Sequence, residues 1–118
     1  MAGVVSRTFE SPDEVRTPAK TTVDVVDVGG TEVGRFTFEP GWRWSECVKP
    51  VVGTDSCQAE HLGYVVSGSI VVAHQDGTEL TLEPGDAYLI APGHDAWVVG
   101  DEPFVGVEFK SAATYARD

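Results

Sequence analysis

The chain has 118 residues and is strongly acidic, with 8 lysines and arginines against 19 aspartates and glutamates and a formal net charge of −11. This balance argues against nucleic acids and anionic membranes as partners, because both require a basic surface. Hydrophobic residues make up 42% of the chain, which excludes the composition of a disordered protein. The length fits one domain over residues 1–118.

The sequence shows neither a long apolar run nor a basic-then-apolar start, so we expect no membrane span and no signal peptide. We therefore expect the protein to be cytoplasmic. Cys47 and Cys57 should then be reduced, although their spacing alone does not exclude a disulfide.

Residues 1–20 form a predicted N-terminal extension. Ser11 suits a helix cap and Pro12 the first helical position, and acidic residues follow. This order predicts a short helical turn that ends before Pro18.

Two strands, residues 21–28 and 31–39, are predicted to form a hairpin around Gly29-Gly30. Pro40-Gly41 ends the second strand. In residues 42–48 the pattern alternates, which places Trp42 and Trp44 on one face. Residues 49–55 are predicted to be a loop.

The centre of the chain, residues 55–68, combines a thiol, an imidazole and carboxylates with a strand that ends at a Ser-Gly turn. Residues two apart in a strand share a face, so His61, Gly63 and Val65 should point together while Tyr64 and Val66 face the other way. Gly63 leaves space beside His61.

Short strands continue to residue 109. Asp76-Gly77 is a strong hairpin turn signal, which places His74 near an exposed hairpin end. Strands are predicted at residues 69–73, 87–90, 96–99 and 104–109, followed by a tail, 111–118, with room for one helical turn. About nine or ten short strands between regular turns predict a sandwich or barrel.

Two stretches resemble the conserved motifs of the cupin family. His61-Leu-Gly-Tyr-Val-Val-Ser-Gly68 resembles the end of the first motif, and Gly85-Asp86-Ala-Tyr-Leu-Ile-Ala-Pro-Gly-His94 resembles the second. The resemblance implies an all-β cupin double-stranded β-helix, or jelly-roll barrel, with strands over residues 21–109 and a small-ligand site at the barrel mouth. It also implies a homodimer, and the surplus aromatic residues Phe36, Phe38, Trp42, Trp44 and Phe104 favour an apolar interface.

The chain departs from the family at its metal ligands. The usual first motif carries His-x-His and then a glutamate, but here Asp55 and Cys57 stand at the histidine positions and His61 at the glutamate. Ala96 stands where the second motif has its histidine. The usual iron or manganese ligand set of three histidines and one glutamate is therefore absent.

A rebuilt metal site would consist of Cys57, His61 and His94, with Cys47 as a further candidate. Thiolate and imidazole select zinc, nickel or copper over calcium. On one regular strand Cys57 and His61 would lie about 13 Å apart, so shared coordination requires a turn between them. In the alternative, Cys57 is a buried apolar residue, His61 forms hydrogen bonds inside the barrel, His94 caps its turn, and no metal binds.

Two functions remain open at this point. One is a small-molecule-binding module with a non-standard His/Cys site, with or without a metal. The other is a metal-dependent enzyme of isomerase, lyase or dioxygenase type, in which His61 could work with Glu46 or Asp55 as general acid and base. The candidate ligand-lining residues are Trp42, Trp44, Cys47 and Trp97, and the two neighbouring tryptophans fit equally well in a core or a dimer interface.

Overall fold

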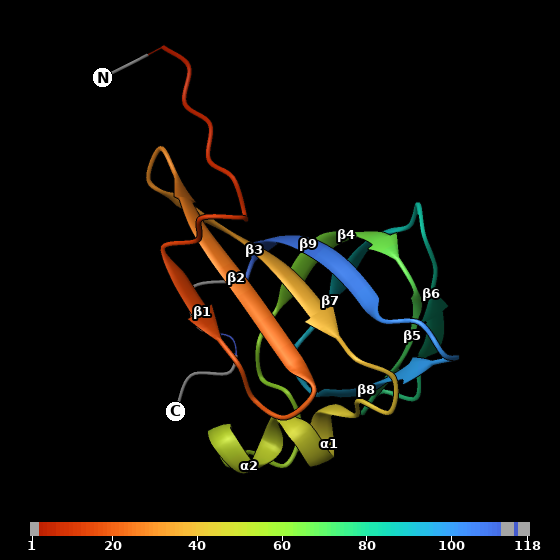
Figure 1. Cartoon of the computed structure of the whole chain (residues 1–118). Helices are drawn as coiled ribbons and strands as arrows, with labels where there is room; N and C mark the ends of the chain where they lie inside the picture. Colours follow the sequence, from red (N-terminus) through yellow and green to blue (C-terminus); the bar gives the residue numbers. More distant parts are fainter. Residues whose placement is uncertain (1–2, 112–114, 116–118) are drawn as a thin grey trace.

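Two antiparallel sheets enclose one apolar interior in the computed structural model, which describes residues 3–111 and 115 (Figure 1). The first sheet has the strand order β1-β2-β3-β9-β4-β7 and the second the order β6-β5-β8. The strands are β1 Glu14–Arg16, β2 Thr21–Val28, β3 Thr31–Phe38, β4 His61–Ser67, β5 Ser69–His74, β6 Glu79–Leu82, β7 Ala87–Ile90, β8 His94–Val99 and β9 Phe104–Lys110. The predicted all-β jelly-roll architecture is confirmed.

The β2–β3 hairpin forms where the Gly-Gly turn predicts it. Val28 pairs with Thr31, and the two turn residues have φ angles of 61° and 99°. A tight hairpin turn of this kind needs positive φ at both central positions, which glycine adopts without steric cost.

The helical turn predicted near Ser11 is wrong, because this segment leads into an edge strand. The backbone N–H of Asp13 donates to Val25 O at 2.8 Å, and its carboxylate accepts the backbone N–H of Asp27 at 2.7 Å. β1 then pairs with β2, Val15 opposite Asp24. Asp13 therefore anchors the extension to the hairpin instead of lying in the first turn of a helix.

The segment after β3 forms two short helices, α1 (Trp44–Cys47) and α2 (Lys49–Val52), so the predicted alternation and loop are both wrong there. Trp44 and Cys47 are buried whereas Glu46 is exposed, which is the spacing of a helix. Gly53, with a φ of 79°, ends α2.

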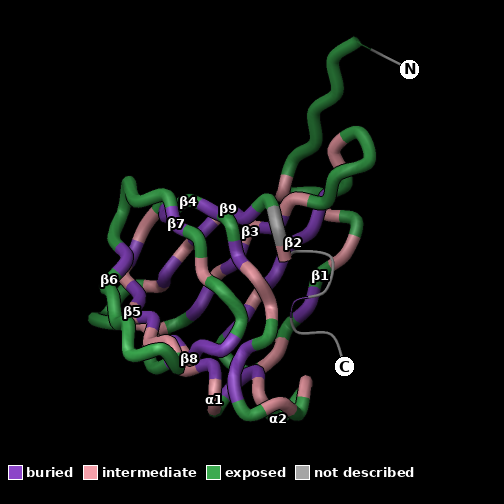
Figure 2. Tube along the Cα trace, turned by 180° about the vertical axis from the view of Figure 1, so that it is seen from behind, coloured by how far each residue is buried: buried purple, intermediate pink, exposed green. Residues whose placement is uncertain are grey.

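The interior is rich in aromatic side chains. Phe36 and Trp42 are almost completely buried, and the Phe38 ring stacks on Trp42 with 3.8 Å between centroids. Figure 2 shows buried segments on the strands around this interior. Phe36, Phe38, Trp42, Trp44 and Phe104 are all core residues, so they do not support the predicted dimer interface.

Backbone hydrogen bonds join the segment around Cys57 to the start of β8. Cys57 N–H donates to His94 O at 2.8 Å, and Gly93 N–H donates to Cys57 O at 2.7 Å. β8 begins at His94, two residues earlier than predicted. This pairing places Cys57 and His94 next to each other although 36 residues separate them in the sequence.

Both cysteines are free thiols. Among the described residues, no helix is long and apolar enough to cross a membrane. Most of the tail predicted to contain a helical turn, residues 112–114 and 116–118, lies outside the described residues.

Candidate metal centre

Cys57, His61 and His94 converge inside the barrel. Their potential ligand atoms all lie within 4.8 Å of one another, and all three residues are buried. The Cys57 Sγ lies 3.6 Å from His61 Nε2, and the two imidazole centroids are 5.1 Å apart. Residues 58–60 belong to no strand and separate the Cys57 bridge from the start of β4, so Cys57 and His61 do not lie on one regular strand.

Both imidazoles are oriented through Nδ1. His94 Nδ1 donates to the carbonyl oxygen of Ala91 at 2.8 Å, and His61 Nδ1 donates to Glu108 Oε1 at 2.6 Å. A neutral imidazole that donates from Nδ1 keeps a lone pair on Nε2. Both histidines can therefore offer Nε2 to an ion, in the arrangement that metal-ligating histidines commonly show.

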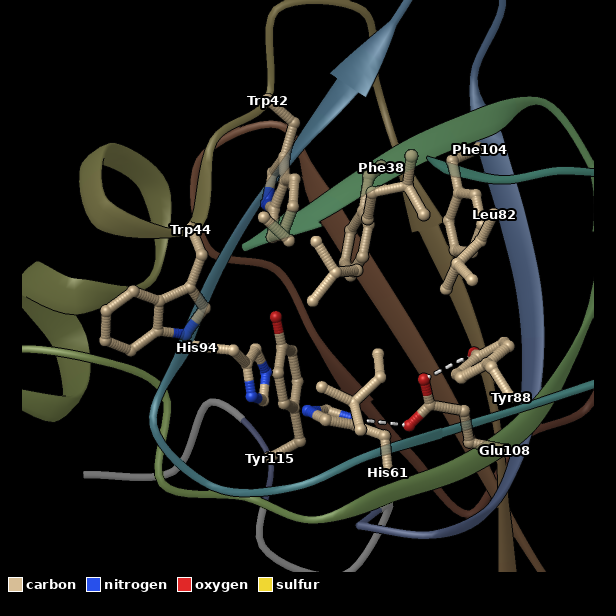
Figure 3. Close-up of a pocket in the computed structure, with 14 residues that line it drawn as sticks. Phe38, Trp42, Trp44, His61, Leu82, Tyr88, His94, Phe104, Glu108 and Tyr115 are labelled. Atoms are coloured by element: carbon tan, nitrogen blue, oxygen red, sulfur yellow. Dashed lines mark hydrogen bonds and ion pairs between the residues drawn. The ribbon is translucent and has the colours of Figure 1, made fainter. Parts of the chain in front are cut away.

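Glu108 is the buried carboxylate behind His61. It accepts hydrogen bonds from the Tyr88 hydroxyl to Oε2 and from the Ser111 hydroxyl to Oε1, both at 2.6 Å. Figure 3 shows the line from Tyr88 through Glu108 to His61. With both oxygens bonded, the carboxylate is fixed in position.

Gly63 makes this contact possible, because it pairs with Tyr88 on β7 and with Glu108 on β9. A Cβ at this position would lie 2.8 Å from Glu108 Cγ and 2.9 Å from the Tyr88 hydroxyl. The space expected beside His61 is thus used by two side chains that meet over the glycine.

Cys57, His61 and Glu108 form a row of contacting ionisable side chains in which the thiol and the carboxyl group lie on either side of the imidazole. Burial raises the pKa of the Cys57 thiol, but hydrogen bonds and charge from His61 and His94 outweigh burial and lower it to about 6. Burial lowers the pKa of His61, but the charge of Glu108 and hydrogen bonds with Cys57 and Glu108 raise it to about 10. The pKa of Glu108 is lowered, because His61, Ser111 and Tyr88 outweigh its burial.

Without a metal, neutral pH therefore favours a Cys57 thiolate, a His61 imidazolium and a Glu108 carboxylate. The anionic thiolate needed for coordination is available in this state, and His61 has a proton to release when it coordinates.

A cavity of about 30 Å³ adjoins the cluster, and its wall includes His61 and His94. Trp42 and Trp44 are among the residues that line it. Cys47 and Trp97 are not among its lining residues. Cys47 belongs to the core, and the half-buried Trp97 ring lies 4.4 Å from the Arg43 guanidinium.

A larger cavity, about 340 Å³, lies beside β6 and β7. It shares Val72, Leu82, Tyr88 and Ile90 with the small one. Tyr88 therefore belongs to the wall between the two spaces while its hydroxyl holds Glu108.

The carboxylates proposed as partners of His61 lie elsewhere. Glu46 and Asp55 are exposed and lie nearest to Arg43 and Lys49, at 3.7 Å and 3.8 Å. His74 is also outside the cluster, and its Nε2 donates to Pro92 O at 2.8 Å.

The sequence interpretation missed Glu108, Tyr88, Ser111 and Tyr115. The available signal for Glu108 was strand alternation, which places it on the face of Phe104 and Gly106, opposite Val105 and Val107.

A family model described as "Cupin domain" matches residues 34–109. Comparison with the curated proteins found no match.

Several solved structures share the fold. A protein of unknown function from Acidithiobacillus ferrooxidans is 16% identical, with a TM-score of 0.63 over 92% of this chain and 97% of that one. KdgF from a Halomonas species is 19% identical, with a TM-score of 0.58 over 92% and 91%. A sugar phosphate isomerase from Silicibacter pomeroyi is 20% identical, with a TM-score of 0.60 over 87% and 73%.

Proposed function

Because the chain belongs to the cupin family, we propose that it is a small-molecule-binding cupin whose metal centre is built from Cys57, His61 and His94. The observation that carries this proposal is the convergence of three buried ligand atoms within 4.8 Å. The Nδ1 contacts of both imidazoles, which leave Nε2 free to coordinate, add to it.

The donor set fits zinc best, with nickel and copper as the next candidates. One thiolate and two imidazoles suit a borderline-soft divalent ion and do not suit calcium or magnesium. A tetrahedral ion held by three protein ligands keeps one position open. A bound zinc ion would supply Lewis-acid polarisation to a small molecule at that position.

The protein's own residues hold the site in place. Glu108 fixes the ring of His61, while Tyr88 and Ser111 fix Glu108. Partners of this kind orient a ligating histidine and raise its basicity. Apolar and aromatic side chains make up most of the cavity wall, and surroundings of low polarity strengthen electrostatic interactions with a bound molecule.

A metal-dependent enzyme of isomerase, lyase or dioxygenase type is the alternative function. One observation favours it: His61, Glu108 and Tyr88 form a buried hydrogen-bonded row that could carry protons next to a bound substrate. The name of the Silicibacter neighbour, a sugar phosphate isomerase, agrees with this class.

Elemental analysis of purified protein tests the metal centre. Wild-type protein grown with added zinc should carry close to stoichiometric zinc, and Cys57→Ser, His61→Ala and His94→Ala should each lose most of it. His74→Ala is the matched control, because this histidine lies outside the cluster, and it should retain the metal.

Equal metal in all five proteins would place the ion elsewhere. No metal in any preparation would contradict the proposal and favour a metal-free binding module. Circular dichroism of each variant shows whether a loss of metal reflects a loss of fold.

A further inference from the structure

The cavity that is lined by His61 and His94 is very small. A water molecule needs at least about 10–15 Å³ of such volume, so the cavity of about 30 Å³ holds two water-sized groups. Sites for drug-sized molecules have volumes of roughly 300–1,000 Å³. The room beside His61 and His94 is therefore insufficient for an ordinary organic ligand.

Tyr115 fills the space that a larger ligand would need. Its side chain is 3% exposed, and its ring centroid lies 5.3 Å from that of His61 and 4.8 Å from that of Phe36. Figure 3 shows the phenol ring beside both histidines, with its hydroxyl pointing into the barrel.

The backbone of Tyr115 is held by defined contacts. The buried Arg16 donates from Nη1 to Tyr115 O at 2.7 Å, and Tyr115 N–H donates to Ser111 O at 2.8 Å. Ser111 has a φ of 102°, a conformation that non-glycine residues hold only when their surroundings impose it. The Ser111 hydroxyl bonds to Glu108, so the centre and Tyr115 share one anchoring residue.

Two hydrogen-bond donors face the cavity. Trp44 and Tyr115 both line it, and Figure 3 places the indole nitrogen of Trp44 on the side of His94. Either donor can form a hydrogen bond with a ligand in this cavity that has acceptor atoms.

We propose that the metal centre takes a small ligand with acceptor atoms, of two or three non-hydrogen atoms, as its fourth ligand, and that Tyr115 sets this size limit. This inference rests on the proposed metal centre. In the complex, Trp44 and Tyr115 donate hydrogen bonds to the acceptor atoms of the ligand.

Formate and benzoate are suitable probes, because they share a carboxylate and differ by a phenyl ring. Cobalt(II) replaces zinc and gives visible absorption that changes when a ligand enters its coordination shell. Formate should change the wild-type spectrum saturably, whereas benzoate should not. Tyr115→Ala should admit benzoate. Tyr115→Phe, which keeps the ring and loses the hydroxyl, should still exclude benzoate and should bind formate roughly tenfold more weakly.

The outcomes separate the two proposals. Absence of a cobalt–thiolate spectrum in wild-type protein would overturn both. A normal cobalt spectrum that responds to neither anion, or equally to both, would overturn the inference and leave the metal centre standing. A cobalt-loaded Tyr115→Ala variant that still excludes benzoate would overturn the size limit assigned to Tyr115.

Discussion

Single residues at the centre are tuned by their immediate neighbours. His61 lies between the Cys57 thiol and the Glu108 carboxylate, so its positive charge stabilises negative charge on both sides. When His61 coordinates a metal it must lose a proton, because only the unprotonated Nε2 can act as a ligand. Metal occupancy should therefore fall as the pH drops and protons compete for these atoms.

The metal-free protein should hold a thiolate at unusually low pH. We expect the ultraviolet absorbance of the Cys57 thiolate to appear with a midpoint at about 6, below the ordinary thiol value of 9.0. Cys47→Ser removes the second thiol from the signal. Below the midpoint Cys57 is a neutral thiol, and above it His61 stabilises the anion.

The His61→Ala variant in the same background is the control for this titration. Removing the imidazole leaves burial, which raises the thiol pKa and is then opposed by His94, so the midpoint should move up. A midpoint that is the same with and without His61 would contradict the charge arrangement described here.

At the scale of elements, the sheet brings the residues of the centre together in one row. Tyr88 on β7, Gly63 on β4 and Glu108 on β9 are cross-strand neighbours. The hydroxyl of Tyr88 reaches Glu108 only because the strand between them has no side chain at that position. Strand pairing and the glycine thus act together to position the carboxylate behind His61.

Gly63→Ala should disrupt this row. The new Cβ would lie 2.6 Å from Val107 O and 2.8 Å from Glu108 Cγ, and overpacking of this kind costs about 1–3 kcal/mol of unfolding free energy. Zinc affinity should also fall by roughly 10–100-fold, as is typical when the partner of a ligating histidine is displaced. Chemical denaturation and a competitive zinc titration measure the two effects.

Val15→Ala is the comparison for that variant, because Val15 is an exposed valine on β1 of the same sheet. Its unfolding free energy should stay within about 0.5 kcal/mol of wild type. If Gly63→Ala were as stable as Val15→Ala and bound zinc normally, the packing argument would be wrong.

Turn signals and strand alternation were enough to predict most elements. Gly29-Gly30 predicted the first hairpin, and motif spacing selected Cys57, His61 and His94. The errors lie where side-chain contacts decide the structure. Asp13 binds the hairpin backbone instead of lying in the first turn of a helix.

The carboxylate behind His61 was missed for a related reason. Glu108 stands 47 residues after His61 and becomes its neighbour only through the pairing of β4 with β9. No local motif marks it, because its neighbours Val107 and Phe109 belong to the opposite, outward face of the strand. Tyr115 reaches the interior from beyond the last strand, so strand patterns could not predict it.

At the scale of the whole molecule, the outer face of the first sheet is apolar where β9, β4 and β7 adjoin. Leu62 pairs with Leu89, and Tyr64 with Val107. The side chains that form this apolar outer patch include Leu62, Tyr64, Val66, Leu89 and Phe109, all exposed. Contiguous apolar surface of this kind commonly marks a protein–protein interface, so we expect a homodimer formed through this patch and not through the aromatic core residues.

Light scattering after size exclusion tests the dimer. Wild-type protein at micromolar concentration should have the mass of a dimer, and the double variant Leu62→Lys, Leu89→Lys should be a folded monomer, because paired lysines in an apolar interface are costly to desolvate. Leu80→Lys alters an equally exposed leucine on the second sheet and should leave the dimer intact. A wild-type monomer would remove this expectation.

The central claim is that one thiolate and two imidazoles hold a single ion, and X-ray absorption spectroscopy of zinc-loaded protein tests it most directly. The account predicts one sulfur at about 2.3 Å and two imidazole nitrogens at about 2.0–2.1 Å, with the sulfur contribution lost in Cys57→Ser. A zinc shell without sulfur in the wild-type protein, or one unchanged by that substitution, would contradict it.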